Sequence, residues 1–208
     1  MLAPRSTLQH LAVVLTALST LTASAPTPEG SPTLEKRACA TQGPSIIDVL
    51  RASTGDNASP GQQFTLARQG SPPYDTINAA ITFEYIPPGA TGCMLQLELP
   101  PLTSDNQIAA GTATQADVWS TQPWNGTHLP TYNHPPVKNQ FVATTVFPTQ
   151  KSTAGFKTIL VSNSCSPQMS FFFELSNWQQ GTGSVNFFNS LGGKQGLQPI
   201  GFSMIYNC

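Results

Sequence analysis

Short apolar segments that alternate with polar residues, and that end at proline or glycine, constrain this chain more than any other feature. In Ala79–Tyr85, the apolar residues Ile81, Phe83 and Tyr85 alternate with polar neighbours, and a Pro-Pro-Gly turn follows shortly afterwards. Residues Met94–Leu99 repeat the pattern, with three leucines at alternate positions. A period of two places alternate side chains on opposite faces of a β-strand. Both segments are therefore predicted to be strands with one buried face.

Segments of the same kind recur along the chain and predict about nine strands in all. Phe171, Phe172 and Phe173 load both faces of one of them, which predicts a central strand covered on both sides. Residues Ser45–Arg51 fit either a strand or one turn of helix, and no segment has the period of a long amphipathic helix. We expect an all-β fold, an antiparallel β-sandwich that is jelly-roll-like. Its other strands are expected at Phe64–Ala67, Ala116–Ser120, Phe141–Phe147, Phe156–Ser162, Met169–Leu175, Ser184–Phe188 and Ile200–Tyr206.

The N-terminal region has the pattern of a secretion signal. Arg5 precedes the short apolar run Leu11–Leu21, and a small-x-small sequence ends at Ala25, so residues 1–25 are expected to be a signal peptide. The run is shorter than the roughly 20 residues that span a bilayer, and we therefore expect no membrane anchor.

A second cut is expected after the signal peptide. Residues 26–37 are rich in Pro, Ser and Thr and end in Lys36-Arg37, which resembles a kexin-type processing site. Residues 38–208 would then form a single domain that is secreted to the cell exterior or the cell wall.

All four cysteines, Cys39, Cys93, Cys165 and Cys208, follow the dibasic site. In an oxidising compartment they favour two disulfides over metal or thiol chemistry, and three pairings are possible. We favour Cys93–Cys165 and Cys39–Cys208, because each joins positions at the edges of predicted strands.

Charged residues make up only 9% of the chain, and residues 38–208 carry a net charge of −2, from six basic and eight acidic side chains. Phosphate binding needs clustered Lys and Arg, which are absent here, so nucleic acid is an unlikely partner. Anionic membrane surfaces are disfavoured for the same reason. The polarity comes from uncharged hydrogen-bonding side chains.

Several segments together resemble a known family. Phe83–Pro87 has the form F-x-x-I-P and Cys93–Pro100 the form C-x-L-x-L-x-L-P; Ala116–Ser120, Thr131–Pro135 and Phe171–Glu174 add to the likeness. The region from Pro73 to Cys208 resembles the fungal ubiquitin 3 binding protein "But-two" C-terminal domain family. The resemblance implies a secreted β-sandwich and supplies no catalytic residues. Binding of an intracellular activating enzyme, from which the family takes its name, does not carry over to an exported chain.

The stretch from Asp117 to Pro136 is the richest in candidate site residues, with Trp119, Trp124, Tyr132 and His128 close together. Aromatic faces stack on sugar rings while amides and hydroxyls meet sugar hydroxyl groups, so this composition suits contact with a glycan. The alternative is that the same rings only pack the strand and the loop onto the sandwich.

Two sequons and two histidines complete the candidates. Asn125 and Asn57 begin N-glycosylation sequons, the second weakened by a following proline. A metal site would need His128, His134 and a carboxylate such as Asp117, but this spacing meets no ligand geometry. We expect neither a metal nor another cofactor.

The sequence favours a non-catalytic protein of the cell surface or wall, structural or glycan-contacting. Its expected partner is a cell-wall polysaccharide or another extracellular protein. A small carbohydrate-active hydrolase is the alternative, since Glu84, Glu98 and Glu174 lie on predicted strands and could pair on one sheet face. No G-x-S-x-G sequence supports a serine hydrolase.

Overall fold

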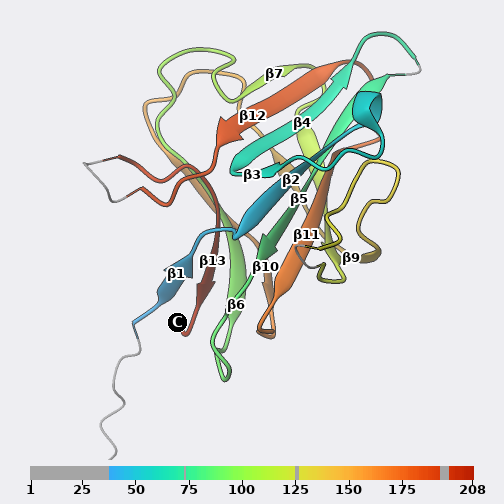
Figure 1. The fold of residues 1–208 in the computed structure, drawn as a ribbon. Coiled ribbons are helices and arrows are strands. Elements are labelled where there is room, and N and C mark those ends of the chain that lie inside the picture. Colours follow the sequence, from blue (N-terminus) through green and yellow to red (C-terminus); the bar gives the residue numbers. More distant parts are fainter. Residues whose placement is uncertain (1–37, 73, 125–126, 193–196) are drawn as a thin grey trace, which may run out of the picture. The chain divides into compact units, whose positions relative to one another are not determined.

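The computed structural model describes residues 38–72, 74–124, 127–192 and 197–208, which form two antiparallel sheets (Figure 1). The described ranges contain no α-helix, only the 3-10 turn η1 (Ala52–Thr54). The all-β antiparallel prediction is confirmed. The four-stranded sheet has the order β1 (Ala40–Gln42), β13 (Gly201–Tyr206), β6 (Cys93–Leu99) and β10 (Phe156–Asn163).

The second sheet has nine strands and branches at β5. Its main path is β7 (Ala109–Gly111), β12 (Gly183–Phe188), β4 (Gln63–Gln69), β5 (Asp75–Phe83), β11 (Met169–Leu175), β8 (Gln115–Thr121) and β9 (Lys138–Val146). On the β4 side of β5, β2 (Ile46–Arg51) also pairs with β5, and β3 (Pro60–Gly61) pairs with β2. Each of the nine expected segments overlaps a strand, and most of the ambiguous Ser45–Arg51 forms the strand β2. The additional β1, β3 and β7 have two or three residues each, too few to show a period.

The main core lies between the two sheets and is built from the residues that alternation selects. Leu95, Leu97 and Leu99 of β6 are almost completely buried, in one cluster with Phe171 and Phe173 of β11. Full burial of such a side chain contributes roughly 1.5–3 kcal/mol relative to exposure. Opposed apolar faces therefore hold the sandwich together.

The expected strand over Ala79–Tyr85 ends earlier, at Phe83. Tyr85 was expected on the buried face, but it has a φ of 62° and is 86% exposed. Ile86 is buried instead, and its N–H donates to Pro167 O at 3.1 Å. The left-handed conformation at Tyr85 turns the chain, so that the next residue returns to the core.

Both expected disulfides are present. Cys39–Cys208 joins the segment before β1 to the end of β13, with the Cα atoms 4.5 Å apart. Cys93–Cys165 joins the start of β6 to the segment after β10, and closes a sequence separation of 72. By the chain-entropy estimate, a loop of that length contributes roughly 4 kcal/mol.

Candidate functional site

The face of the nine-stranded sheet that points away from the four-stranded sheet, here the outer face, carries a second apolar cluster. Asp48, Ala80, Phe172 and Trp119 are directly opposite one another across β2, β5, β11 and β8. Ala80 and Phe172 are buried together with Leu50 of β2. A sheet face is buried only when another element covers it.

The covering element lies between β8 and β9 and is described at residues 122–124 and 127–137, here called the strap (yellow in Figure 1). Trp124 and Tyr132 of the strap pack against the outer cluster. Trp124 Nε1 donates to Asp48 Oδ2 at 3.1 Å, and the Tyr132 hydroxyl is 2.5 Å from Thr76 Oγ1. Gln168 Nε2 donates to Trp124 O at 2.7 Å. The two aromatic residues thus fasten the strap to β2 and β5.

Asp48 is the most unusual ionisable group on this face. Its side chain is completely buried, and Oδ1 has no hydrogen-bond partner among the described residues. Burial raises the pKa of the carboxyl from 3.8 to about 6, and the hydrogen bond from Trp124 offsets part of that rise. The strap is therefore fastened to a group that titrates in the mildly acidic range.

A groove of about 520 Å³ runs along the strap. It is lined mainly by apolar and ring-bearing side chains, among them Trp124, His128, His134 and Val137, and Asp56 also lines it. His134 Nδ1 lies 3.5 Å from Asp56 Oδ1, and both side chains are highly exposed. An apolar groove with a few polar groups at its edge suits a ligand that has both apolar faces and hydroxyl groups.

The four predicted contact residues have different surroundings. Trp124 and His128 line the groove. Tyr132 contacts the apolar cluster and Thr76, while Trp119 lies edge-on to Phe141 with centroids 5.2 Å apart. Trp119 Nε1 is buried and finds no partner among the described residues. Packing roles are therefore evident for Trp119 and Tyr132, and Trp124 combines packing with a place in the groove.

Other predicted positions are on the surface or outside the described residues. Asn57 is exposed, but the end of its sequon is tied to β2: Ser59 O accepts from Val49 N at 3.1 Å, and Pro60 of β3 pairs with Asp48 of β2. The second sequon asparagine and the processing pair fall outside the described residues, as does the signal segment; these are Asn125, Lys36, Arg37 and residues 1–25.

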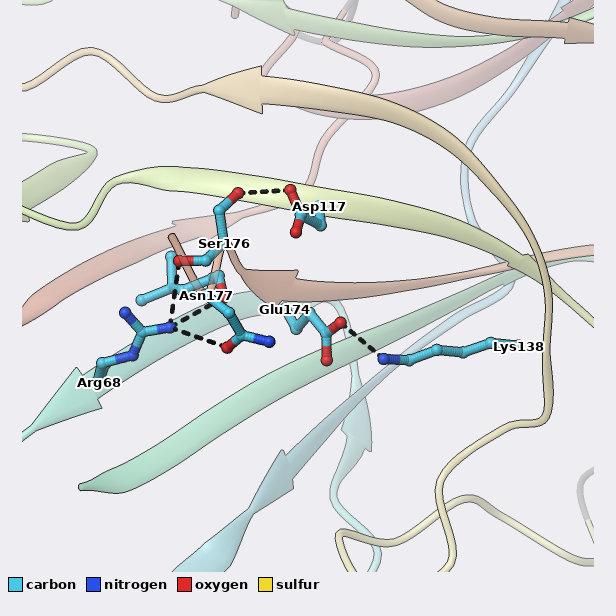
Figure 2. Close-up of polar contacts among 7 residues, drawn as sticks. Arg68, Asp117, Lys138, Glu174, Ser176 and Asn177 are labelled. Carbon is cyan, nitrogen blue, oxygen red and sulfur yellow. Dashed lines mark hydrogen bonds and ion pairs between the residues drawn. The ribbon is translucent and has the colours of Figure 1, made fainter. Parts of the chain in front are cut away.

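A separate polar cleft of about 140 Å³ lies on the outer face beside the strap. Its polar lining comes from β4, β5, the strap and the end of β11: Arg68, Thr76, Asn78, Tyr132, Glu174 and Asn177. Figure 2 shows Arg68 in contact with the segment after β11, and Glu174 paired with Lys138 of β9 at 2.6 Å. Lys138 Nζ also lies 5.0 Å from the Trp119 ring centroid and 4.9 Å from that of Phe172.

The hydrolase alternative needs two of Glu84, Glu98 and Glu174 on one sheet face, and Glu98 lies on a different sheet from Glu174. Glu98 lies in β6 of the four-stranded sheet, Glu84 follows the end of β5, and Glu174 lies in β11 of the nine-stranded sheet. Glu174 is instead directly opposite Asp117 of β8. Asp117 Oδ1 accepts from Ser176 Oγ at 2.5 Å (Figure 2). The register between β8 and β11, which are distant in the sequence, places Asp117 opposite Glu174. The residue pattern of a single strand does not contain this information.

Sequence reasoning missed Asp48, Arg68 and Asn78. A signal existed for Asp48, because a single carboxylate inside the apolar run Ile46–Leu50 has no period that places it in solvent. Arg68 and Asn78 carry no such signal, since polar residues on strands are ordinarily solvent-facing. In the described ranges, no three side chains of His, Cys, Asp or Glu gather as a metal site would require.

No protein-family model matches the chain, and no curated protein matches it. No helix in the described part of the chain is long and apolar enough to cross a membrane. The fold and the two disulfides define the class: an antiparallel β-sandwich protein stabilised by cystines, as is typical of oxidising, extracellular-type compartments.

Proposed function

We propose that this chain is a secreted, non-catalytic β-sandwich of the fungal cell surface or wall that contacts glycans through the strap. The supporting observation is the groove of about 520 Å³, in which Trp124 takes part while its indole N–H is held by Asp48. An indole that the fold already orients loses little further freedom when a sugar ring stacks on it.

We also propose membership of the "But-two" C-terminal domain family. The two motifs behind the resemblance, Phe83–Pro87 and Cys93–Pro100, span the end of β5, the connection after it and all of β6. In the structure they supply Ile86 to the core and Cys93 to a disulfide.

Retention on insoluble chitin and β-glucan tests the proposed function. Trp124→Ala should abolish retention of the mature chain, whereas Trp124→Phe keeps an aromatic ring and should retain most of it. Trp178→Ala is the matched control, because Trp178 is 66% exposed on the β11–β12 connection and does not line the groove. Failure of the wild-type protein to bind either polymer, or equal retention of Trp124→Ala, contradicts the proposal.

Hydrolysis is a second candidate, because Asp117 and Glu174 are directly opposite each other on one sheet face. Residues paired in this way have Cβ atoms about 4.5–5.5 Å apart, so the two side chains start from neighbouring positions on the face, and retaining glycosidases use two carboxyl groups about 5–5.5 Å apart. Release of reducing sugar from the same polymers tests it. Wild-type activity that Glu174→Gln abolishes would favour the hydrolase, and no release by the wild type would exclude it for these substrates.

A further inference from the structure

The polar cleft lies next to the proposed glycan groove. Thr131 lines the groove and the adjacent Tyr132 lines the cleft, so consecutive strap residues border both. A volume of about 140 Å³ admits several water molecules or one small polar group. A ligand that follows the strap would therefore reach the cleft.

Arg68 is part of the cleft wall, and its guanidinium is hydrogen-bonded to backbone carbonyl groups of the protein. It is 8% exposed, and its guanidinium donates to Gln179 O at 2.5 Å, Leu175 O at 3.0 Å and Ser176 O at 3.3 Å. These carbonyls hold the segment after β11 against β4. Arg68 also reaches Asn177 Oδ1 at 3.5 Å, which leaves the Asn177 amide nitrogen to donate elsewhere.

Three side chains in the cleft have hydrogen-bonding capacity left over within the described residues. Glu174 accepts from Lys138 through Oε1, and Oε2 has no partner of its own. Asn78 makes no side-chain hydrogen bond, and the Asn177 amide nitrogen makes none either. The cleft therefore offers one carboxylate acceptor beside two amides that can donate and accept.

This set of groups selects a neutral polyhydroxy ligand. A sugar hydroxyl can donate to the carboxylate and accept from an amide at the same time, and neighbouring hydroxyls repeat that pattern. An anion would meet the negative charge of Glu174, and a cation would meet Arg68 and Lys138. Tyr132, at the edge of the cleft, adds an aromatic surface for a sugar ring.

We infer that the cleft formed by Asn78, Tyr132, Glu174 and Asn177 is a specificity subsite that recognises the hydroxyl groups of one neutral sugar unit. The inference rests on the proposed glycan contact at the strap and adds residues outside the groove. The groove would supply stacking, and the cleft would select among sugars by the directions of their hydroxyls.

Calorimetric titration of the mature chain with laminarihexaose and chitohexaose tests the inference. Glu174→Gln and Asn78→Ala should each weaken binding of the preferred oligosaccharide about 10-fold, as expected for loss of a hydrogen bond to a charged group or to the half-buried Asn78 amide. Glu98→Gln is the matched control, since Glu98 also pairs with a lysine, Lys157 at 3.3 Å, but on the four-stranded sheet. It should bind like the wild type.

The outcomes separate this inference from the proposed function. If the wild type binds and Trp124→Ala abolishes binding, but both cleft variants bind normally, the cleft inference is wrong and the groove stands. Tighter binding of tri-galacturonic acid than of either neutral probe would overturn the ligand class. If the wild type binds neither neutral probe, and neither polymer retains it, both proposals fail.

Discussion

The two faces of β11 are buried by different means. On the inner face, Phe171 and Phe173 pack against the four-stranded sheet, as regular alternation predicts. On the outer face, Phe172 is buried by the strap, an irregular segment held by the hydrogen bonds that Trp124 and Tyr132 make with Asp48 and Thr76. A sheet packed on a sheet has redundant support, whereas the outer cluster depends on a few anchors. The outer face should therefore be the more adjustable of the two, which suits a binding surface.

The largest expected difference is between adjacent phenylalanines. Phe173→Ala should lower the free energy of unfolding by about 3–5 kcal/mol, because the cavity lies between two rigid sheets. Phe172→Ala should lower it by about 2 kcal/mol, because the strap can move into the space. Urea denaturation of both variants measures the difference. A larger loss for Phe172→Ala would show that the strap is as rigid as a sheet.

The second prediction concerns Asp48, which faces the strap. Folding raises its pKa above the unfolded value, so its stabilising contribution is present below pH 3.8 and is lost as the pH rises through about 6. The difference between the unfolded and folded pKa values corresponds to a loss of about 3 kcal/mol in the free energy of unfolding. Asp48→Asn should remove this pH dependence and be more stable than the wild type at pH 7. Asp75→Asn, at an exposed site in β5, should preserve it. If the free energies of unfolding of the wild type and of Asp48→Asn change in parallel between pH 4 and pH 7, the raised pKa of Asp48 is wrong.

A smaller effect on stability is expected at Tyr132, the second aromatic residue that fastens the strap to the sheet. Tyr132→Phe removes the hydrogen bond to Thr76 and should lower the free energy of strap opening by about 1 kcal/mol. Hydrogen exchange of the strap amides should report the change, while global unfolding in urea stays nearly constant. Tyr85→Phe is the control, because that hydroxyl is on an exposed ring. Unchanged exchange in Tyr132→Phe would mean that the strap does not open locally.

The smallest expected effect is the difference in coupling energy between two ion pairs, one on each sheet. Lys138–Glu174 lies over the Trp119 and Phe172 rings, and its side chains are 34% and 20% exposed. Lys157–Glu98 is more exposed, at 61% and 28%. Double-mutant cycles should give about 1 kcal/mol for the first pair and about 0.2 kcal/mol for the second. Equal coupling energies would show that the outer face of the nine-stranded sheet stabilises an ion pair no better than the four-stranded sheet does.

Much of the fold was predictable from local pattern. Alternation located nine strands. The positions of Cys39, Cys93, Cys165 and Cys208 at strand edges favoured one of three possible pairings, and the structure has that pairing. The prediction failed where one residue changed the backbone direction, as at Tyr85, and where strands were too short to show a period, as at β3.

The candidate site was less predictable. The aromatic-rich segment identified the strap and Trp124, but the cleft draws Asn78, Glu174 and Tyr132 from three distant parts of the chain. Each is unremarkable in its own segment. Their meeting depends on the order β5-β11-β8 and on the register within it.

The amino-acid sequence by itself determined most of the strands and their apolar faces, because these follow from a period of two. It also placed the four cysteines at the edges of predicted strands, which favoured one pairing among three. Tertiary structure alone decided that Asp48 is buried beneath Trp124, that Glu174 is opposite Asp117, and that a polar cleft borders the strap. The physical reason is range: side-chain alternation acts between neighbouring residues, whereas strand order, register and the covering of a second face are set by contacts between residues far apart in the chain.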